Sequence, residues 1–199
     1  MRWSWLVLGL LLTYAGLFVA SSLESTDCAN CWQATATLSE LYLAQEKFRN
    51  TDADRNGIKD YWRTDVAGLY TLAPDGEPLK FIGLSTAQAD RRPAAPVPGG
   101  RVTKCAYWFE TLGFGDEKKP DPMRFAYCAW PDVPYRNEWT FMVDHHGVIY
   151  GKRIAPYWPP EFYPADPTAE GWVTLERVRK IRWKESHRLL WWVRFWNAL

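Results

Sequence analysis

Apolar residues recur with a helical period over residues 32–49, WQATATLSELYLAQEKFR. Positions three or four residues apart share one face of a helix. The residues that fall on this face are Ala34, Leu38, Leu41, Gln45 and Phe48. Glu40 and Lys47 lie off it. The spacing predicts an amphipathic helix whose apolar stripe packs on the core of the domain.

Later segments are rich in β-branched and aromatic residues, which is typical of strands. They are residues 102–112, 123–131 and 139–154. The polar residues 113–122 join the first two as a hairpin. A second hairpin turn is expected at Asp144-His145-His146-Gly147, with Gly147 at positive φ. His145 and His146 are expected to be an exposed pair whose side chains diverge. The prediction is an α+β fold in which a long N-terminal helix packs on an antiparallel sheet.

The other segments are less regular. Residues 66–72 are a short apolar segment, and residues 79–90 suit a strand or a helix equally well. Two proline-rich stretches, residues 91–100 and 155–167, are expected to lack regular structure. Residues 171–199 regain helical character, with arginines and lysines mixed with tryptophans. This predicts a C-terminal amphipathic helix that either lies on a membrane surface or docks on its own domain.

The N-terminal residues 3–20 form an uncharged apolar run after Arg2. The run is long for a signal peptide and close to the length of a spanning helix. We therefore expect a retained single-pass anchor with the bulk of the chain outside the cytoplasm, and cleavage after the small residues 19–22 is the alternative. The expected organisation is an anchor at 1–22, an extracytoplasmic domain at 23–165 and a basic, tryptophan-rich tail at 166–199.

The net charge and the absence of known catalytic motifs argue against some classes of function. The formal net charge of the 199 residues is +1, which gives no reason to expect a nucleic-acid partner. No G-x-S-x-G, phosphate-binding loop or H-E-x-x-H motif occurs in the sequence. We expect a protein without enzymatic activity.

Four cysteines are expected to form disulfides in an oxidising compartment. Four cysteines allow three pairings. The expected one joins Cys28 to Cys31 and Cys105 to Cys128, because the second pair lies in two expected strands. The Cys-x-x-Cys spacing of the first pair also suits a redox dithiol, although the βαβ context of a thioredoxin-like site is missing.

The stretch TDADRNGIKDYW, residues 51–62, is a candidate calcium loop. Its first positions match the D-x-[DN]-x-[DN]-G pattern, in which alternate oxygen ligands surround a hard cation. The expected ligands are Asp52, Asp54, Asn56, the carbonyl of Ile58, and Asp60. Arg63 occupies the position of the bidentate acid of an EF-hand, so the loop would be a smaller, structural site, with Asp65 as a helper. The alternative is a polar turn in which these side chains bond to their own backbone.

Several longer stretches carry a family resemblance. They are ATATLSELYLAQEKFRNTDADRNGIKDYWRTDVAGLYTL, AYWFETL, RFAYCAWPDVPYRNEWTF and MVDHHGVIYGKRI. Over roughly residues 32–154 the chain resembles pseudopilin-like proteins related to type II secretion, with the family's motifs at Ala126–Pro131 and Thr140–Tyr150. The N-terminus departs from the family, since it lacks the Gly-Phe processing site and the helix glutamate of pilin-like precursors.

The resemblance implies a membrane-anchored, extracytoplasmic protein with a structural or interaction role. Its partners would be the membrane and other pilin-like subunits or secretion components. The alternatives are a secreted or periplasmic ligand-binding module and, third, a Cys-x-x-Cys thiol oxidoreductase.

Overall fold

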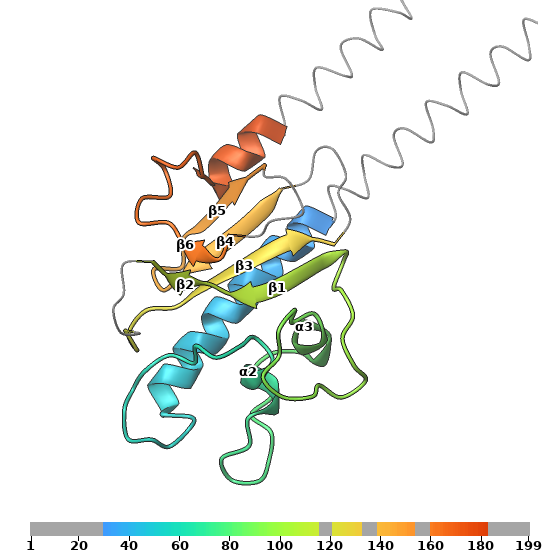
Figure 1. Ribbon diagram of the computed structural model, residues 1–199, viewed down its shortest axis with the longest axis vertical. Coiled ribbons are helices and arrows are strands. Elements are labelled where there is room, and N and C mark those ends of the chain that lie inside the picture. The colour runs from blue at the N-terminus through green and yellow to red at the C-terminus, as the bar shows by residue number, and fades with distance from the viewer. Residues whose placement is uncertain (1–29, 116–120, 133–138, 154–159, 183–199) are drawn as a thin grey trace, which may run out of the picture.

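A long helix and an antiparallel sheet form the framework of the protein. The computed structural model describes residues 30–115, 121–132, 139–153 and 160–182. In Figure 1 the long helix, residues 30–51, runs across one face of the sheet. The sheet has the strand order β1-β3-β4-β5-β7. Its strands are β1 (Tyr107–Thr111), β3 (Ala126–Pro131), β4 (Thr140–Asp144), β5 (Ile149–Lys152) and β7 (Val173–Thr174). The α+β prediction is confirmed at this level. The expected anchor, residues 1–22, and half of the expected tail, residues 183–199, lie outside the described residues.

Short elements complete the described fold. The chain forms α2 (Gly68–Thr71) and α3 (Leu84–Gln88) between the long helix and β1. β2 (Gly113–Phe114) pairs in parallel with β6 (Phe162–Tyr163), although residues 155–167 were expected to lack regular structure. Phe162 approaches β2 closely because Gly113 has no side chain: a Cβ there would lie 3.1 Å from Cδ1 of Phe162. A helical segment, residues 175–182, follows β7.

The apolar stripe of the long helix forms the main core, as the period predicted. Leu38, Leu41 and Phe48 are 0–1% exposed. They belong to one cluster with sheet residues that include Tyr107, Phe109, Tyr127, Phe141 and Val143. Full burial of a side chain of this size stabilises the fold by about 1.5–3 kcal/mol. The helix is therefore held mainly by this packing against the sheet.

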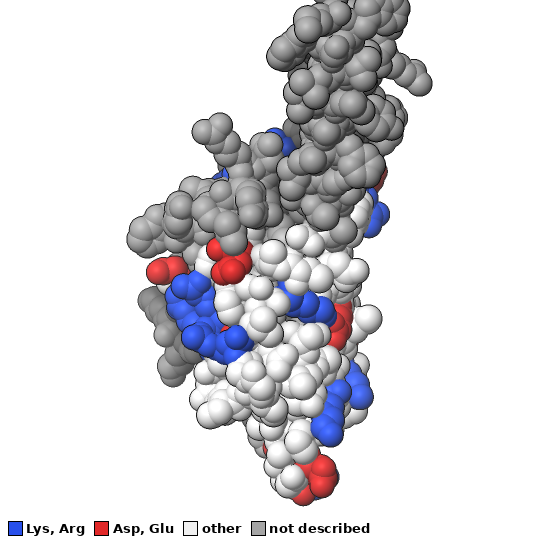
Figure 2. Space-filling model, turned by 90° about the vertical axis from the view of Figure 1, so that its right-hand side faces the viewer, with Lys and Arg blue, Asp and Glu red and all other residues white. Residues whose placement is uncertain are grey.

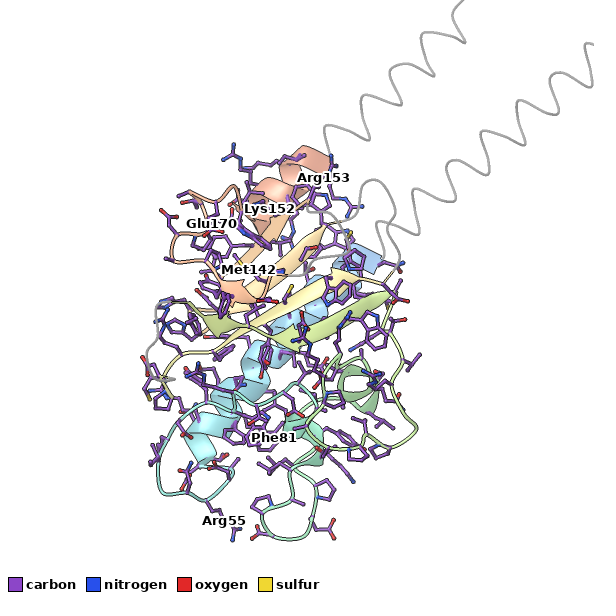
Figure 3. The ribbon with its side chains drawn as sticks, in the orientation of Figure 1. Arg55, Phe81, Met142, Lys152, Arg153 and Glu170 are labelled. Atoms are coloured by element: carbon purple, nitrogen blue, oxygen red, sulfur yellow. The ribbon has the colours of Figure 1, made fainter. Side chains whose placement is uncertain are left out.

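The opposite face of the sheet carries a second, smaller cluster. Its members are Leu112, Phe114, Ala126, Cys128, Trp130, Met142 and Trp172. Figure 3 shows Met142 within the sheet, with Lys152 and Glu170 nearby. The Lys152 Nζ donates a hydrogen bond of 2.6 Å to the Glu170 carbonyl, so the segment before β7 is held to β5. Both faces of the sheet are thus buried, which explains the continuous burial of β3 and β4.

The first strand begins later than the sequence predicts. Cys105 and Ala106 have φ of 52° and 62°, in the left-handed region that strands do not use. β1 therefore starts at Tyr107, and the expected strand over residues 102–112 is shortened at its N-terminal end. The hairpin of β4 and β5 is confirmed, with Gly147 at a φ of 73°.

Two buried carboxylates organise the segment between the long helix and β1. Asp65 Oδ1 accepts hydrogen bonds from the Gly68 amide and the Trp62 indole, both at 2.9 Å. Asp90 Oδ2 accepts from the amides of Val66 and Ala67 at 2.8 and 2.7 Å. These bonds satisfy amides at the start of α2 that have no intrahelical acceptor. The expected role of Asp65 as a calcium helper is wrong, because its carboxylate is 3% exposed and bonded to this segment.

Asp90 gives the stability of the protein a pH dependence. Burial raises the pKa of its carboxyl group from 3.8 to about 6, and the amides that bond to it offset part of this effect. Between about pH 4 and pH 6 the folded chain therefore binds more protons than the unfolded chain at this position. We expect the free energy of unfolding to fall as the pH rises through this window, by at most about 3 kcal/mol from Asp90.

Urea unfolding at several pH values, compared with Asp90→Asn, checks this expectation. In Asp90→Asn the free energy of unfolding should fall less steeply with rising pH, because the contribution of Asp90 is gone. Burial also raises the pKa of Glu110, so a contribution of the same sign from Glu110 should remain in both proteins. Parallel slopes for the two proteins would show that Asp90 titrates in the folded state as it does in the unfolded state.

Candidate functional site

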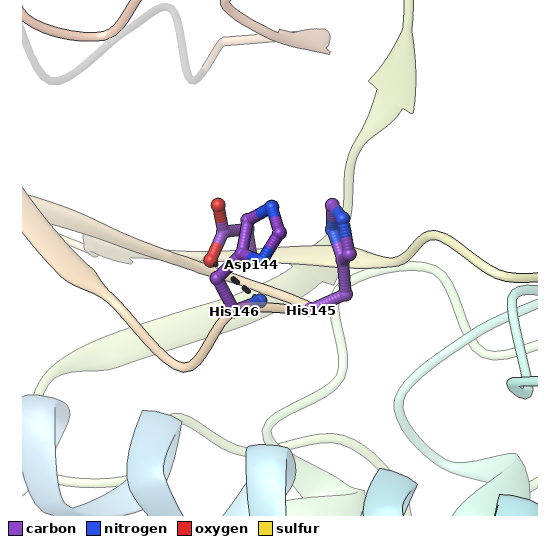
Figure 4. Close-up of side chains that lie close together, drawn as sticks. All are labelled: Asp144, His145 and His146. Carbon is purple, nitrogen blue, oxygen red and sulfur yellow. Dashed lines mark hydrogen bonds between the residues drawn. The ribbon is translucent and has the colours of Figure 1, made fainter.

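The turn between β4 and β5 brings three side chains with metal-binding atoms together. One ligand atom each from Asp144, His145 and His146 lies within 4.8 Å of the other two. Figure 4 shows both imidazole rings on the same side of the turn, beside the Asp144 carboxylate. The ring centroids are 4.0 Å apart. The expectation that the two histidine side chains diverge is therefore wrong.

Backbone geometry explains why the two rings meet. Asp144 Oδ1 accepts a hydrogen bond of 3.0 Å from the His146 amide, and the Gly147 amide donates to the Asp144 carbonyl at 2.9 Å. These two bonds close a tight turn directly after β4. A Cβ at Gly147 would lie 2.9 Å from Cζ of Tyr42 on the long helix. The helix thus supports the turn from below, and the glycine is needed both for its φ and for this close approach.

The carboxylate of the site is oriented by a tyrosine from a distant segment. Asp144 is 4% exposed, and the Tyr163 hydroxyl of β6 donates a hydrogen bond of 2.8 Å to its Oδ2. Burial and this carboxylate both raise the pKa of Tyr163. The pairing of β2 with β6 places Tyr163 here, so the site depends on residues that are far apart in the sequence.

His145 lies in a less polar environment than a turn residue usually does. Its ring is 6.4 Å from the Phe114 ring, and its Nδ1 is inaccessible to solvent and without a hydrogen-bond partner among the described residues. Burial lowers the pKa of His145, His146 and Arg124 lower it further, and Asp144 opposes the shift. The neutral imidazole is therefore favoured, and this is the form that binds metal ions.

The predicted calcium ligands lie in a loop after the long helix. The Gly57 amide donates to Asp52 Oδ2 at 3.2 Å, and the Ile58 amide donates to Asn56 Oδ1 at 2.7 Å. Asp54 Oδ2 accepts from the Asn56 side chain at 2.8 Å. The Ile58 carbonyl accepts from the Asp60 amide at 3.0 Å.

This loop thus has the hydrogen bonds of the alternative, a polar turn that bonds to its own backbone. Its acids are not among the groups of three close ligand atoms within the described residues. Arg55, a residue of this loop, forms an ion pair with Asp75. Figure 3 shows Arg55 at the opposite end of the molecule from Arg153. Calcium binding at this loop stays a prediction.

The described cysteines are free thiols. The predicted Cys105–Cys128 bond is wrong, because both thiols are free: Cys128 pairs with Glu110, three residues along β1 from Tyr107, and Cys105 precedes Tyr107. That separation, about 10 Å at the rise of a strand, exceeds the reach of a disulfide. Cys31 is 5% exposed, with its Sγ 3.4 Å from the Tyr107 hydroxyl oxygen. Its expected partner, Cys28, lies outside the described residues.

The side of the molecule drawn in Figure 2 carries no large patch of a single charge among the described residues. Figure 2 shows one side of the molecule, where uncharged residues predominate and positive and negative side chains form small separate groups. Among the helices that the structure describes, none combines the length and the apolar character needed to span a bilayer. The apolar run of residues 3–20 lies outside the part described.

Sequence reasoning missed the cluster because it expected the side chains of His145 and His146 to diverge at the turn, which would make a shared metal ion awkward. The adjacent Asp-His-His letters were visible, but the contribution of Tyr163 and the support from Tyr42 depend on the fold. No family model matches this chain, and no curated protein sequence and no solved structure matches it either.

Proposed function

We propose that this chain is a non-enzymatic, membrane-anchored protein whose pilin-like domain lies outside the cytoplasm and binds other subunits. The observation that carries the proposal is the long helix, residues 30–51, packed across an antiparallel sheet. This is the arrangement that the resemblance to pseudopilin-like proteins implies. The uncharged run of residues 3–20 precedes that helix in the sequence and has nearly the length of a spanning helix.

The outer face of the long helix supports an interaction role. Leu43 is 65% exposed, whereas Trp32, which is 43% exposed, has the Arg179 guanidinium of the helical segment 4.6 Å from the centre of its ring. Ala36 and Ser39 precede Leu43 at helical spacing and are also exposed, so these three residues form one row. Small and apolar side chains in one row allow a second helix to approach closely. We propose that this row contacts a second copy of the chain.

The anchor is tested with the full chain produced in a bacterium. We expect a mass that includes residues 1–22, retention in the membrane pellet after an alkaline wash, and digestion by protease added from outside. Leu11→Arg places a charge at the centre of the apolar run, which opposes insertion by about 2.5–3.5 kcal/mol, and should release the protein. A mature chain that starts near Ser21 in a soluble extracytoplasmic fraction would support the secreted binding module instead.

The interaction is tested by a photo-crosslinking residue in intact membranes. At position 43 we expect an adduct of about twice the 23.1 kDa chain mass. The matched control is position 77, an exposed site in the turn between α2 and α3, where no adduct is expected. Equal yields at the two positions, or none at either, would count against the helix row as the contact surface.

A further inference from the structure

We propose that Asp144, His145 and His146 form a binding site for a divalent transition-metal ion of the zinc type. This goes beyond the proposed interaction role, and it concerns a different part of the molecule from the predicted calcium loop. The three side chains come from consecutive residues at the turn between β4 and β5. Their ligand atoms lie within 4.8 Å of one another.

The kind of ion follows from the donor atoms. Imidazole nitrogen suits zinc, copper, nickel and iron, whereas calcium and magnesium are bound through oxygen. Two imidazoles and one carboxylate are a known type of zinc ligand set, which leaves a fourth position for water or another group. The exposure of His146 places that open position toward solvent, so an ion has a direct route to the site.

The distances are compatible with one ion after a small movement of the side chains. Zinc bonds of about 2.0–2.1 Å in a tetrahedron put the ligand atoms about 3.4 Å apart. The ligand atoms lie within 4.8 Å of one another, so a pair at that limit would need to close by about 1.4 Å, and rotation of the exposed His146 ring moves its own nitrogen toward the other two ligand atoms. Asp144 and His145 have less freedom to move, because Asp144 is buried at the end of β4 and the Phe114 ring lies beside His145.

A second observation is independent of the spacing. The Nδ1 of His145 is inaccessible and makes no hydrogen bond among the described residues. A buried polar group without a partner destabilises a fold, and an ion bound to Nδ1 itself would supply that partner.

The carboxylate already has the surroundings of a metal ligand. The Tyr163 hydroxyl donates to Asp144 Oδ2 at 2.8 Å, and the His146 amide donates to Oδ1 at 3.0 Å. Hydrogen bonds of this kind orient ligating groups, and their loss typically weakens metal affinity about 10–100-fold. Tyr163 is therefore a positioning residue for the site.

Titration of the full chain in mild detergent with zinc, after removal of metals by a chelator, tests the proposal. We expect one ion per chain with a dissociation constant below about 0.1 mM. His146→Gln should weaken binding at least about tenfold, and Tyr163→Phe by about tenfold. His187→Gln is the matched control, because it removes the remaining histidine of the chain without changing the turn, and it should bind as the unaltered protein does.

Cobalt absorption gives a readout of the ligands themselves. A cobalt spectrum that His146→Gln changes, His187→Gln preserves and excess calcium does not displace supports the site. His146 is exposed, so its replacement should leave the protein folded even where His145→Gln does not. Equal affinities for the unaltered protein and His146→Gln, loss of binding in His187→Gln, or no zinc binding at about 1 mM would each overturn the proposal.

Discussion

Leu38→Ala is expected to lower the free energy of unfolding by about 3–5 kcal/mol, whereas Leu43→Ala changes it by no more than about 0.5 kcal/mol. Both leucines are on the long helix, and the chemical change is the same. Leu38 is 0% exposed in the core between helix and sheet, and Leu43 is 65% exposed. The difference arises because removing Leu38 leaves a cavity that the sheet cannot fill.

Urea unfolding of the two variants, followed by tryptophan fluorescence, measures this difference. The comparison cancels most of the effect of helix propensity, since both changes put alanine into the same helix. Similar losses for the two variants would mean that the helix is not packed on the sheet through the Leu38 face. They would also remove the observation on which the proposed function rests.

Gln45→Ala is expected to destabilise the fold by about 3–5 kcal/mol although Gln45 is a polar residue. Its side chain is 0% exposed. Gln45 Oε1 accepts a hydrogen bond of 3.0 Å from the Trp62 amide, and Nε2 donates to the Trp62 carbonyl and the Tyr127 hydroxyl. The side chain therefore joins the long helix, the following loop and β3.

The cost comes from the groups left behind. Alanine at position 45 leaves the partly buried Trp62 amide without its acceptor, at about 1–3 kcal/mol for an unsatisfied group, leaves the Tyr127 hydroxyl with only its long bond of 3.5 Å to the Trp62 carbonyl, and adds a cavity. Gln33→Ala is the control, because Gln33 is exposed on the same helix, and a change of no more than about 0.5 kcal/mol is expected. A loss below about 1 kcal/mol for Gln45→Ala in urea unfolding would show that water replaces these bonds.

The helix and the hairpin were predictable because each depends on local spacing. Leu38, Leu41 and Phe48 recur with the period of a helix, and the stripe they define is buried as expected. Gly147 marks the hairpin turn because few other residues accept a positive φ. Gln45 also fell on the predicted stripe, but only the fold shows that Trp62 and Tyr127 satisfy its amide.

The errors in the sequence analysis concern contacts between distant segments. Cys105 and Cys128 were paired because both were assigned to strands, whereas the left-handed backbone at Cys105 ends the strand and the register separates the two thiols. Asp65 was considered an ion ligand, whereas its Oδ1 accepts hydrogen bonds from the Gly68 amide and the Trp62 indole and its Oδ2 accepts one from the Ala94 amide. Spacing along the chain carries no information about such partners.

The sequence by itself determined the α+β class, the helix that covers the sheet and the position of the hairpin turn. Only the tertiary structure decided that His145 and His146 lie side by side next to a carboxylate held by Tyr163. The physical reason is that a helical or strand period is set by neighbours a few residues away, whereas a site is set by side chains that meet after folding. Tyr42 lies beside Gly147 and Tyr163 bonds to Asp144, although the two tyrosines are far apart in the sequence. A local sequence pattern cannot predict such contacts.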